Sequence, residues 1–250
     1  MAFPFTVHLG YGQEKVETST QKQKLGTRAV TPDGRVFYYA ENSGAAITTA
    51  GQLVDGIAAV GADDGDLATA ALAAGSLTVT TTTSLTVTKD QYKDGYLFIN
   101  DNAAQGEVYR IKSNTAVSSA AGLEIRLDEP DGIRTAFTTS TQFGLMYPPY
   151  KDIKLMDNDG TMTTGPLGVT TIAVTADYFC WIQTAGPAAV LSGAATFVVG
   201  DAVGISKADE NGAIDLWDAS TEEDSRPIGT SMGVVSVDTE YGWVMLAIRD

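Results

Sequence analysis

Residues 76–88 alternate between two kinds of side chain, and this alternation limits the fold more than any other feature of the chain. Leu77, Val79, Leu85 and Val87 share one parity, while Thr and Ser fill the other. A period of two places the aliphatic set on one face of a β-strand, whereas a helix would scatter it around the helix axis. Threonine is also stiff at χ1 and favours strands. The segment therefore predicts a half-buried strand.

Similar short apolar runs recur along the chain, with turn signals between them at about 10–15-residue spacing. The sequence Pro32-Asp33-Gly34 is a turn signal that predicts a hairpin, because Pro presets φ and Gly accepts positive φ. Residues 53–75 leave loops, short strands or one helical turn open, since glycines interrupt a helical spacing. We expect an all-β fold whose further strands lie at residues 36–40, 96–99, 108–111, 123–127, 171–174, 178–182, 196–199, 233–237 and 243–248.

Two consecutive prolines, Pro148 and Pro149, mark the best domain boundary, because they donate no ladder hydrogen bonds and favour a stiff connector. A small barrel accounts for the five candidate strands that follow, since closing a sheet removes its exposed edges. The expected organisation is an extended N-terminal arm and hairpin at residues 1–40, a β-sandwich or barrel domain at residues 41–147, and a small C-terminal β-barrel at residues 151–250.

Residues 11–28 contain only three side chains suited to a core, too few to offset the ~1–2 kcal/mol per residue lost on ordering the backbone. Two interpretations stay open: a frayed terminus, or an arm that becomes ordered against a partner. Residues 1–40 carry five basic and three acidic side chains, so the arm would suit a negative surface, including another copy of the chain. Its candidate partner-binding residues are Tyr11, Lys15, Val16, Lys22, Lys24, Leu25 and Arg28.

The charge balance excludes several classes of partner. Acidic side chains outnumber basic ones 31 to 16, for a net charge of −15. Nucleic acids and anionic membrane surfaces are bound through clustered Lys and Arg, so we expect neither as a partner. The chain also lacks an apolar run near the ~20 residues of a membrane span, and its first residues do not have the pattern of a secretory signal.

The residues available for catalysis are few. His8 and Cys180 are the only histidine and cysteine, and Cys180 lies in an apolar run that predicts core packing. The sequence Gly229-Thr230-Ser231-Met232-Gly233 matches the nucleophile elbow of α/β hydrolases, but the residues after it predict a strand where that motif needs a helix. We expect no catalytic residue, no cofactor and no enzymatic activity.

Acidic turns offer only weak candidates for a metal. Residues 157–160 and 63–66 resemble the opening of calcium loops, but Gly168 stands where an EF-hand beginning at Asp157 places its last acidic ligand. Ordinary turns are the preferred interpretation, with weak calcium binding left open and no metal site assigned. The acidic residues at 209–210 and 222–224 predict solvated loops.

Tryptophan positions bear on carbohydrate binding. Trp181 and Trp243 lie within apolar runs and are expected to fill the core. Trp217 has acidic neighbours and is the better candidate for an exposed aromatic that contacts a sugar.

Three parts of the chain resemble head structural proteins of tailed bacteriophages, especially marine ones. Residues 25–37, LGTRAVTPDGRVF, resemble the N-terminal part of such proteins. Residues 94–101, DGYLFIND, followed by residues 106–111, GEVYRI, are similar to their middle β domain. The C-terminal stretches resemble the small barrel of capsid decoration, or cement, proteins: YFCWIQTAGP at residues 178–187, VGDAVG at 199–204 and IGTSMG at 228–233.

This resemblance implies a virion protein, made in the host cytoplasm, that binds the major capsid protein on the outside of an expanded capsid. It further implies self-association as a homotrimer and stabilisation of the capsid against the pressure of packaged DNA. A head fibre, a turret or a receptor (glycan)-binding module of the virion is the alternative.

Overall fold

The computed structural model describes residues 6–249 except 60, 62, 64, 84–85, 119–121, 159–161, 194–195, 207–209, 219–225, 236 and 238. In these residues one short 3₁₀ helix, η1 (Gln13–Lys15), accompanies seventeen β-strands, which confirms the all-β class. The chain divides into two compact units. Unit 1 comprises Met1–Ile57 and Pro149–Asp250, and unit 2 comprises Ala58–Pro148.

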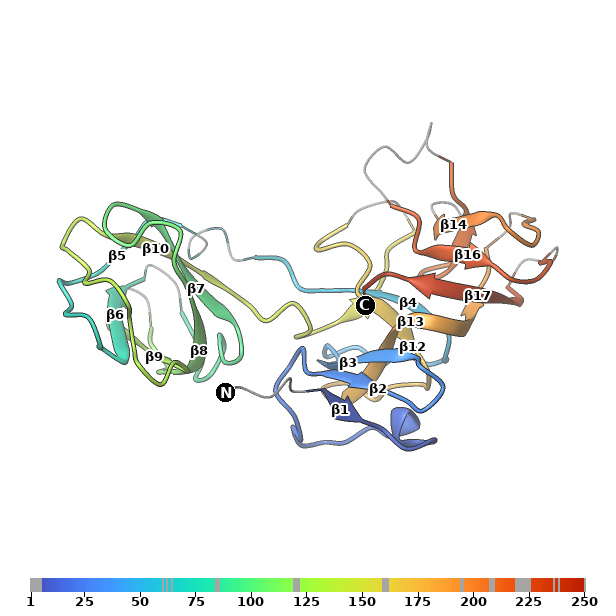
Figure 1. The fold of residues 1–250 in the computed structure, drawn as a ribbon, viewed down its shortest axis with the longest axis horizontal. Coiled ribbons are helices and arrows are strands. Elements are labelled where there is room, and N and C mark those ends of the chain that lie inside the picture. The colour runs from blue at the N-terminus through green and yellow to red at the C-terminus, as the bar shows by residue number, and fades with distance from the viewer. Residues whose placement is uncertain are drawn as a thin grey trace. The chain divides into compact units, whose positions relative to one another are not determined.

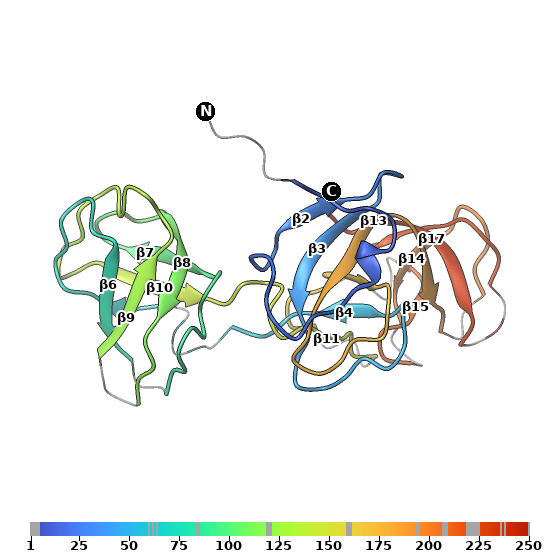
Figure 2. The same ribbon diagram turned by 90° about the horizontal axis from the view of Figure 1, so that it is seen from below.

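Unit 2 is a barrel-like antiparallel sheet with the strand order β5-β10-β7-β8-β9-β6. The strands are β5 (Leu67–Ala68), β6 (Thr78–Thr82), β7 (Tyr96–Asp101), β8 (Val108–Asn114), β9 (Gly122–Leu127) and β10 (Gln142–Met146). The hydroxyl of Thr81 donates to the carbonyl oxygen of Ala68 at 2.7 Å, which joins the two edge strands β5 and β6. The sheet is therefore nearly closed around a single core (Figure 2).

The predicted alternation is present in β6. Val79 and Thr81 are buried, while Thr80 and Thr82 are exposed. The paired strand β9 repeats the pattern, because its aliphatic residues face the core and Glu124 and Arg126 face solvent. The period-two argument is confirmed for Val79 and Val87, which are buried, but it was wrong for Leu77, which precedes the strand and is 40% exposed; Leu85 lies outside the described residues.

Unit 1 contains a larger sheet in the order β1-β2-β3-β13-β17-β16-β14-β15, with β12, β4 and β11 attached beside β13. The predicted turn at Pro32-Asp33-Gly34 joins β2 to β3, and Gly34 has the expected positive φ of 85°. The strands of unit 1 are β1 (Val7–His8), β2 (Arg28–Val30), β3 (Val36–Glu41), β4 (Leu53–Asp55), β11 (Lys154–Leu155), β12 (Gly168–Thr170), β13 (Phe179–Leu191), β14 (Ala202–Ile205), β15 (Ile214–Leu216), β16 (Gly229–Ser231) and β17 (Tyr241–Ala247).

The strand β13 is long and runs through unit 1 (Figure 1). Its buried residues belong to two different cores of that unit. Its first half pairs with β3 up to Ala185, and its second half pairs with β17 from Ala185 onward. The pairing with β3 shifts register between Gln183 and Ala185, and Gly186 has a φ of 89°. The strand was predicted to end near Ile182. It continues because this bulge accommodates Gly186-Pro187 within the sheet.

Three of the expected strands, at residues 171–174, 196–199 and 233–237, were wrong. The described residues of these segments form only isolated bridges, Ile47–Val174 and Phe197–Val235, and no ladder. The observed strands β12 and β16 lie a few residues earlier, at Gly168–Thr170 and Gly229–Ser231. Continuous apolar runs do not indicate where a ladder begins, so these boundaries were not available from periodicity.

The division of the chain also differs from the expected one. The boundary between Pro148 and Pro149 falls within the predicted connector, but residues 1–40 are not a separate segment and unit 2 begins after Ile57. The reason is long-range pairing: β3 pairs with β13, and β4 pairs with β11 and β12. Unit 2 is thus an insertion in unit 1. The flanking residues of unit 1 are adjacent, because a Cβ on Gly56 would lie 2.8 Å from the carbonyl oxygen of Pro149.

Candidate interaction surfaces

Two loops of unit 1 present an exposed apolar cluster, which we call the valine tip. The loops are joined because Phe197 and Val235 exchange backbone hydrogen bonds at 3.2 and 3.0 Å, and Gly200 donates to Ser231 O at 2.9 Å. Both bridging side chains are buried, so Val198 and Val234, which lie directly beside them in the chain, point outward. The members of the valine tip, each 43–66% exposed, are Val198, Val199, Met232, Val234 and Val237.

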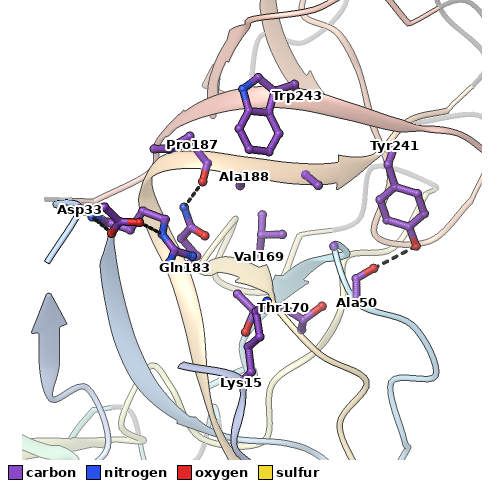
Figure 3. Close-up of a pocket in the computed structure, with 14 residues that line it drawn as sticks. Lys15, Asp33, Ala50, Val169, Thr170, Gln183, Pro187, Ala188, Tyr241 and Trp243 are labelled. Carbon is purple, nitrogen blue, oxygen red and sulfur yellow. Dashed lines mark hydrogen bonds and ion pairs between the residues drawn. The ribbon is translucent and has the colours of Figure 1, made fainter. Parts of the chain in front are cut away.

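A groove of about 570 Å³ lies beside β17 (Figure 3). One wall is aromatic: Trp243 and Tyr241 are 51% and 48% exposed, and the Tyr241 hydroxyl donates to Ala50 O at 3.0 Å. Gly51 allows this close packing, because a Cβ there would lie 2.6 Å from the Tyr241 ring. The remaining lining comes from five other segments of unit 1 and includes Lys15, Asp33, Arg35, Val169, Thr170, Thr171, Gln183, Pro187 and Ala188.

Gln183 is a buried polar side chain of this groove, as is Thr170. Its Nε2 donates to the carbonyl oxygens of Ala185 at 3.2 Å and Pro187 at 2.9 Å, which satisfies two acceptors at the bulge of β13. Both neighbours are acceptors, so the amide nitrogen must face them and Oε1 must face the other way. Figure 3 shows Oε1 turned into the groove, and it accepts no hydrogen bond from the described residues.

Arg35 fixes the charged end of the groove. Its guanidinium pairs with Asp33 at 2.9 Å and with the buried Glu14 at 3.4 Å, and it lies over the ring of Phe37. A hydrogen bond from the Thr31 hydroxyl, together with contacts from Arg35, holds the pKa of Asp33 below its ordinary value despite opposing desolvation. The Arg35 charge is therefore compensated within unit 1. Lys15 forms no ion pair with any described residue.

The predicted arm residues lie along unit 1. Thr18 bridges to Phe179, the Lys22 N–H donates to the Tyr39 hydroxyl at 3.0 Å, and the Thr171 hydroxyl donates to Glu14 O at 2.8 Å. Contacts within the unit thus order this segment, and the interpretation that only a partner orders it is corrected. The count of apolar side chains missed these polar and backbone bonds.

The seven candidate arm residues are not brought together at one site. Leu25 belongs to the core, Arg28 is half-buried in β2, and the carbonyl of Lys24 accepts bonds from Thr27. Lys15 lines the groove described above. Val16 and Lys22 line a separate hollow beside Tyr39 and Trp181, and Tyr11 is exposed.

The tryptophan predictions were partly wrong. Trp181 is buried as expected, but Trp243 is half-exposed and Trp217 is only partly exposed. Every residue from Trp243 to Ile248 is apolar, so the sequence did not indicate which parity of β17 faces the core. In the structure Val244 and Leu246 are buried, and Tyr241, Trp243 and Met245 face outward.

The three residues considered for catalysis, Ser231, Cys180 and His8, lie on three different strands. Ser231 of the G-x-S-x-G sequence lies in strand β16, is buried, and donates its hydroxyl hydrogen bond to Gly233 O at 2.8 Å. Cys180 is buried in β13, and desolvation, with a smaller effect of Glu17, raises the pKa of its thiol to about 12. His8 is exposed on β1.

The acidic turns differ from calcium loops where they are described. Asp63 is buried and accepts hydrogen bonds from Thr83 at 2.8 Å and from Tyr92 at 2.5 Å. Asp157 pairs with Lys154 at 2.6 Å. Asp64, Asp159, Gly160, Asp209 and residues 222–224 lie outside the described residues. Among those described, no group of three His, Cys, Asp or Glu side chains is placed to hold a metal ion.

In the part of the chain that the structure describes, none of the helical residues forms a segment long and apolar enough to cross a membrane. A scan against protein-family models and searches of curated proteins and of solved structures find no match to this chain.

Proposed function

We propose that the protein is a virion structural protein of a tailed bacteriophage, which decorates the outside of the capsid and cements it against the pressure of the packaged DNA. It acts without catalysis, as a homotrimer bound to the major capsid protein. The sequence resemblance in three segments supports the class of protein, and the valine tip supplies a surface suited to the task.

The valine tip is the observation that carries this proposal. Isolated apolar residues are ordinary on a protein surface, but a cluster of five on two hydrogen-bonded loops is typical of an interaction site. Apolar side chains gain free energy when a partner removes them from water. Because backbone hydrogen bonds at Phe197, Gly200 and Val235 tie the two loops together, little ordering entropy is lost when they bind.

Many copies bound to one capsid would together bind more strongly than the contacts of a single copy allow. A standard interface buries roughly 800 Å² on each partner, and linked copies on a lattice bind with greater avidity than one copy alone. A trimer that contacts neighbouring capsid subunits would resist their separation in this way. The acidic net charge of −15 is compatible with a protein partner and unfavourable for the packaged nucleic acid.

The first experiment is the copy number of the protein in purified virions, by quantitative mass spectrometry. Hundreds of copies, comparable with the major capsid protein, are expected. A dozen or fewer would overturn the decoration role and indicate a tail, portal-proximal or fibre position. Absence from the particle would overturn the proposal altogether.

The second experiment tests the valine tip itself. Val234→Lys places a charge in the cluster and should weaken binding to expanded capsids at least tenfold, about 1.4 kcal/mol. Val108→Lys is the matched control, because Val108 is an exposed strand valine of unit 2. Equal binding by wild type and Val234→Lys would remove the valine tip from the mechanism.

A further inference from the structure

We propose that the groove beside β17 is a binding site for an acidic oligosaccharide. One sugar ring would lie against the Trp243 indole, a sugar hydroxyl would donate to Gln183 Oε1, and a carboxylate would pair with Lys15. This inference is independent of capsid docking through the valine tip, because the groove residues are different.

The dimensions and walls of the groove suit a saccharide. Its volume of about 570 Å³ lies within the range of roughly 300–1,000 Å³ found for small-molecule sites. Sugar rings have apolar C–H faces that pack on aromatic rings, and the half-exposed Trp243 and Tyr241 provide such rings. Figure 3 shows both side chains on the β17 side of the groove, with Val169 and Ala188 lying between them and Lys15.

The amide of Gln183 offers the groove a hydrogen-bond acceptor. Gln183 is only 2% exposed, and its Nε2 is fully used by Ala185 O and Pro187 O. Oε1 is open to solvent from the groove, so a donor on a ligand would take the place of water there. Sugar hydroxyls are such donors, whereas a purely apolar occupant would displace that water without replacing its hydrogen bond.

The charge at the groove indicates an anionic sugar. Arg35 is already compensated by Glu14 and Asp33, while Lys15 has no ion-pair partner among the described residues. In a chain with net charge −15, an unpaired ammonium beside a hydrogen-bonding groove favours a carboxylated ligand. The attraction is between exposed groups, so it should weaken as salt is added.

The purified full-length protein is titrated with trisaccharides of galacturonate, glucuronate and mannuronate, and with neutral maltotriose as comparator, by isothermal calorimetry and tryptophan fluorescence. Saturable binding is expected for at least one acidic trisaccharide, with at least tenfold weaker binding of maltotriose. Trp243→Ala should raise the dissociation constant at least tenfold, and Lys15→Gln should raise it about fivefold and reduce its salt dependence.

Matched controls separate the site from general effects. Lys112→Gln changes an exposed lysine of unit 2, and Tyr11→Ala removes an exposed aromatic outside the groove; neither should alter binding. Both groove substitutions affect exposed side chains, so circular dichroism should show retained folding. The proposal is overturned by absence of saturable binding to all three acidic trisaccharides, by equal binding of maltotriose, or by unchanged affinity in Trp243→Ala.

Discussion

The buried carboxylate of Asp55 binds Thr164, which lies 109 positions further along the chain, through two hydrogen bonds of 2.9 Å from the backbone N–H and the hydroxyl. Asp55 also accepts the N–H groups of Gly56 at 2.7 Å and Thr163 at 2.6 Å. Both carboxylate oxygens are thus used to hold the segment that precedes β12 against the end of β4. This cluster joins the two parts of unit 1 that flank unit 2.

Replacement of this carboxylate should destabilise unit 1. Asp55→Asn places an amide nitrogen near one of the backbone N–H donors and should lower the free energy of unfolding by roughly 1–3 kcal/mol. Urea denaturation followed by tryptophan fluorescence measures unit 1 alone, because all three tryptophans belong to it. Asp157→Asn is the control, since the exposed pair with Lys154 contributes at most about 1 kcal/mol. Equal effects of the two substitutions would contradict this role of Asp55.

The Tyr92 hydroxyl should stabilise unit 2 through Asp63. Tyr92→Phe keeps the ring that stacks on Tyr147, but it leaves one buried carboxylate oxygen without its donor. We expect a loss of roughly 1–3 kcal/mol, measured by hydrogen exchange of unit 2 peptides. Tyr96→Phe on β7 is the control, and the prediction fails if it matches the effect of Tyr92→Phe.

Unit 2 should lose stability in acid partly through Glu107. Desolvation raises the pKa of this carboxyl, but hydrogen bonds from Thr135 and Tyr109 outweigh it and hold the pKa below its ordinary value. A lowered folded-state pKa gives stability that is complete above the unfolded value of about 4.3 and is lost as the pH falls through the folded value. Below about pH 4.3, the midpoint temperature for thermal unfolding of unit 2 should therefore change less with pH in Glu107→Gln than in wild type. An unchanged pH profile would contradict the assignment.

Cys180 should be unreactive in the folded protein. Desolvation raises its thiol pKa to about 12, and its side chain is buried in β13. Because the thiolate is the reacting form, a disulfide reagent at pH 8 should modify Cys180 only after unfolding. The rate of thiol modification, followed over time with and without urea, measures this difference. Rapid modification of the native protein would show that β13 opens locally.

The sequence predicted the class of fold and several strands, but not how distant segments pair. Val79 and Leu123 follow a period of two, so their burial was predictable from local pattern. By contrast, the pairing of β3 with β13 depends on contacts between residues more than a hundred positions apart, for which periodicity contains no signal. This pairing assigns the N-terminal residues to unit 1.

The candidate surfaces were less predictable than the fold. The outward orientation of Trp243 depends on the register of β17, and its neighbours are apolar on both parities. The role of Gln183 was not predictable, because a glutamine in a strand is ordinary and its significance comes from the bulge beside it. For the valine tip, Val198-Val199 and Val234 were visible as apolar residues, but the bridge that directs them outward was not.

The contact between Gly56 and Pro149 has a consequence for how such a protein can diversify. Unit 2 leaves and rejoins unit 1 at neighbouring points, so it occupies the position of a cassette. A different domain with closely spaced ends could take its place through one recombination event, without disturbing the pairing of β4 with β12. The same junction would let an engineered binding domain be displayed at this position on an unchanged scaffold.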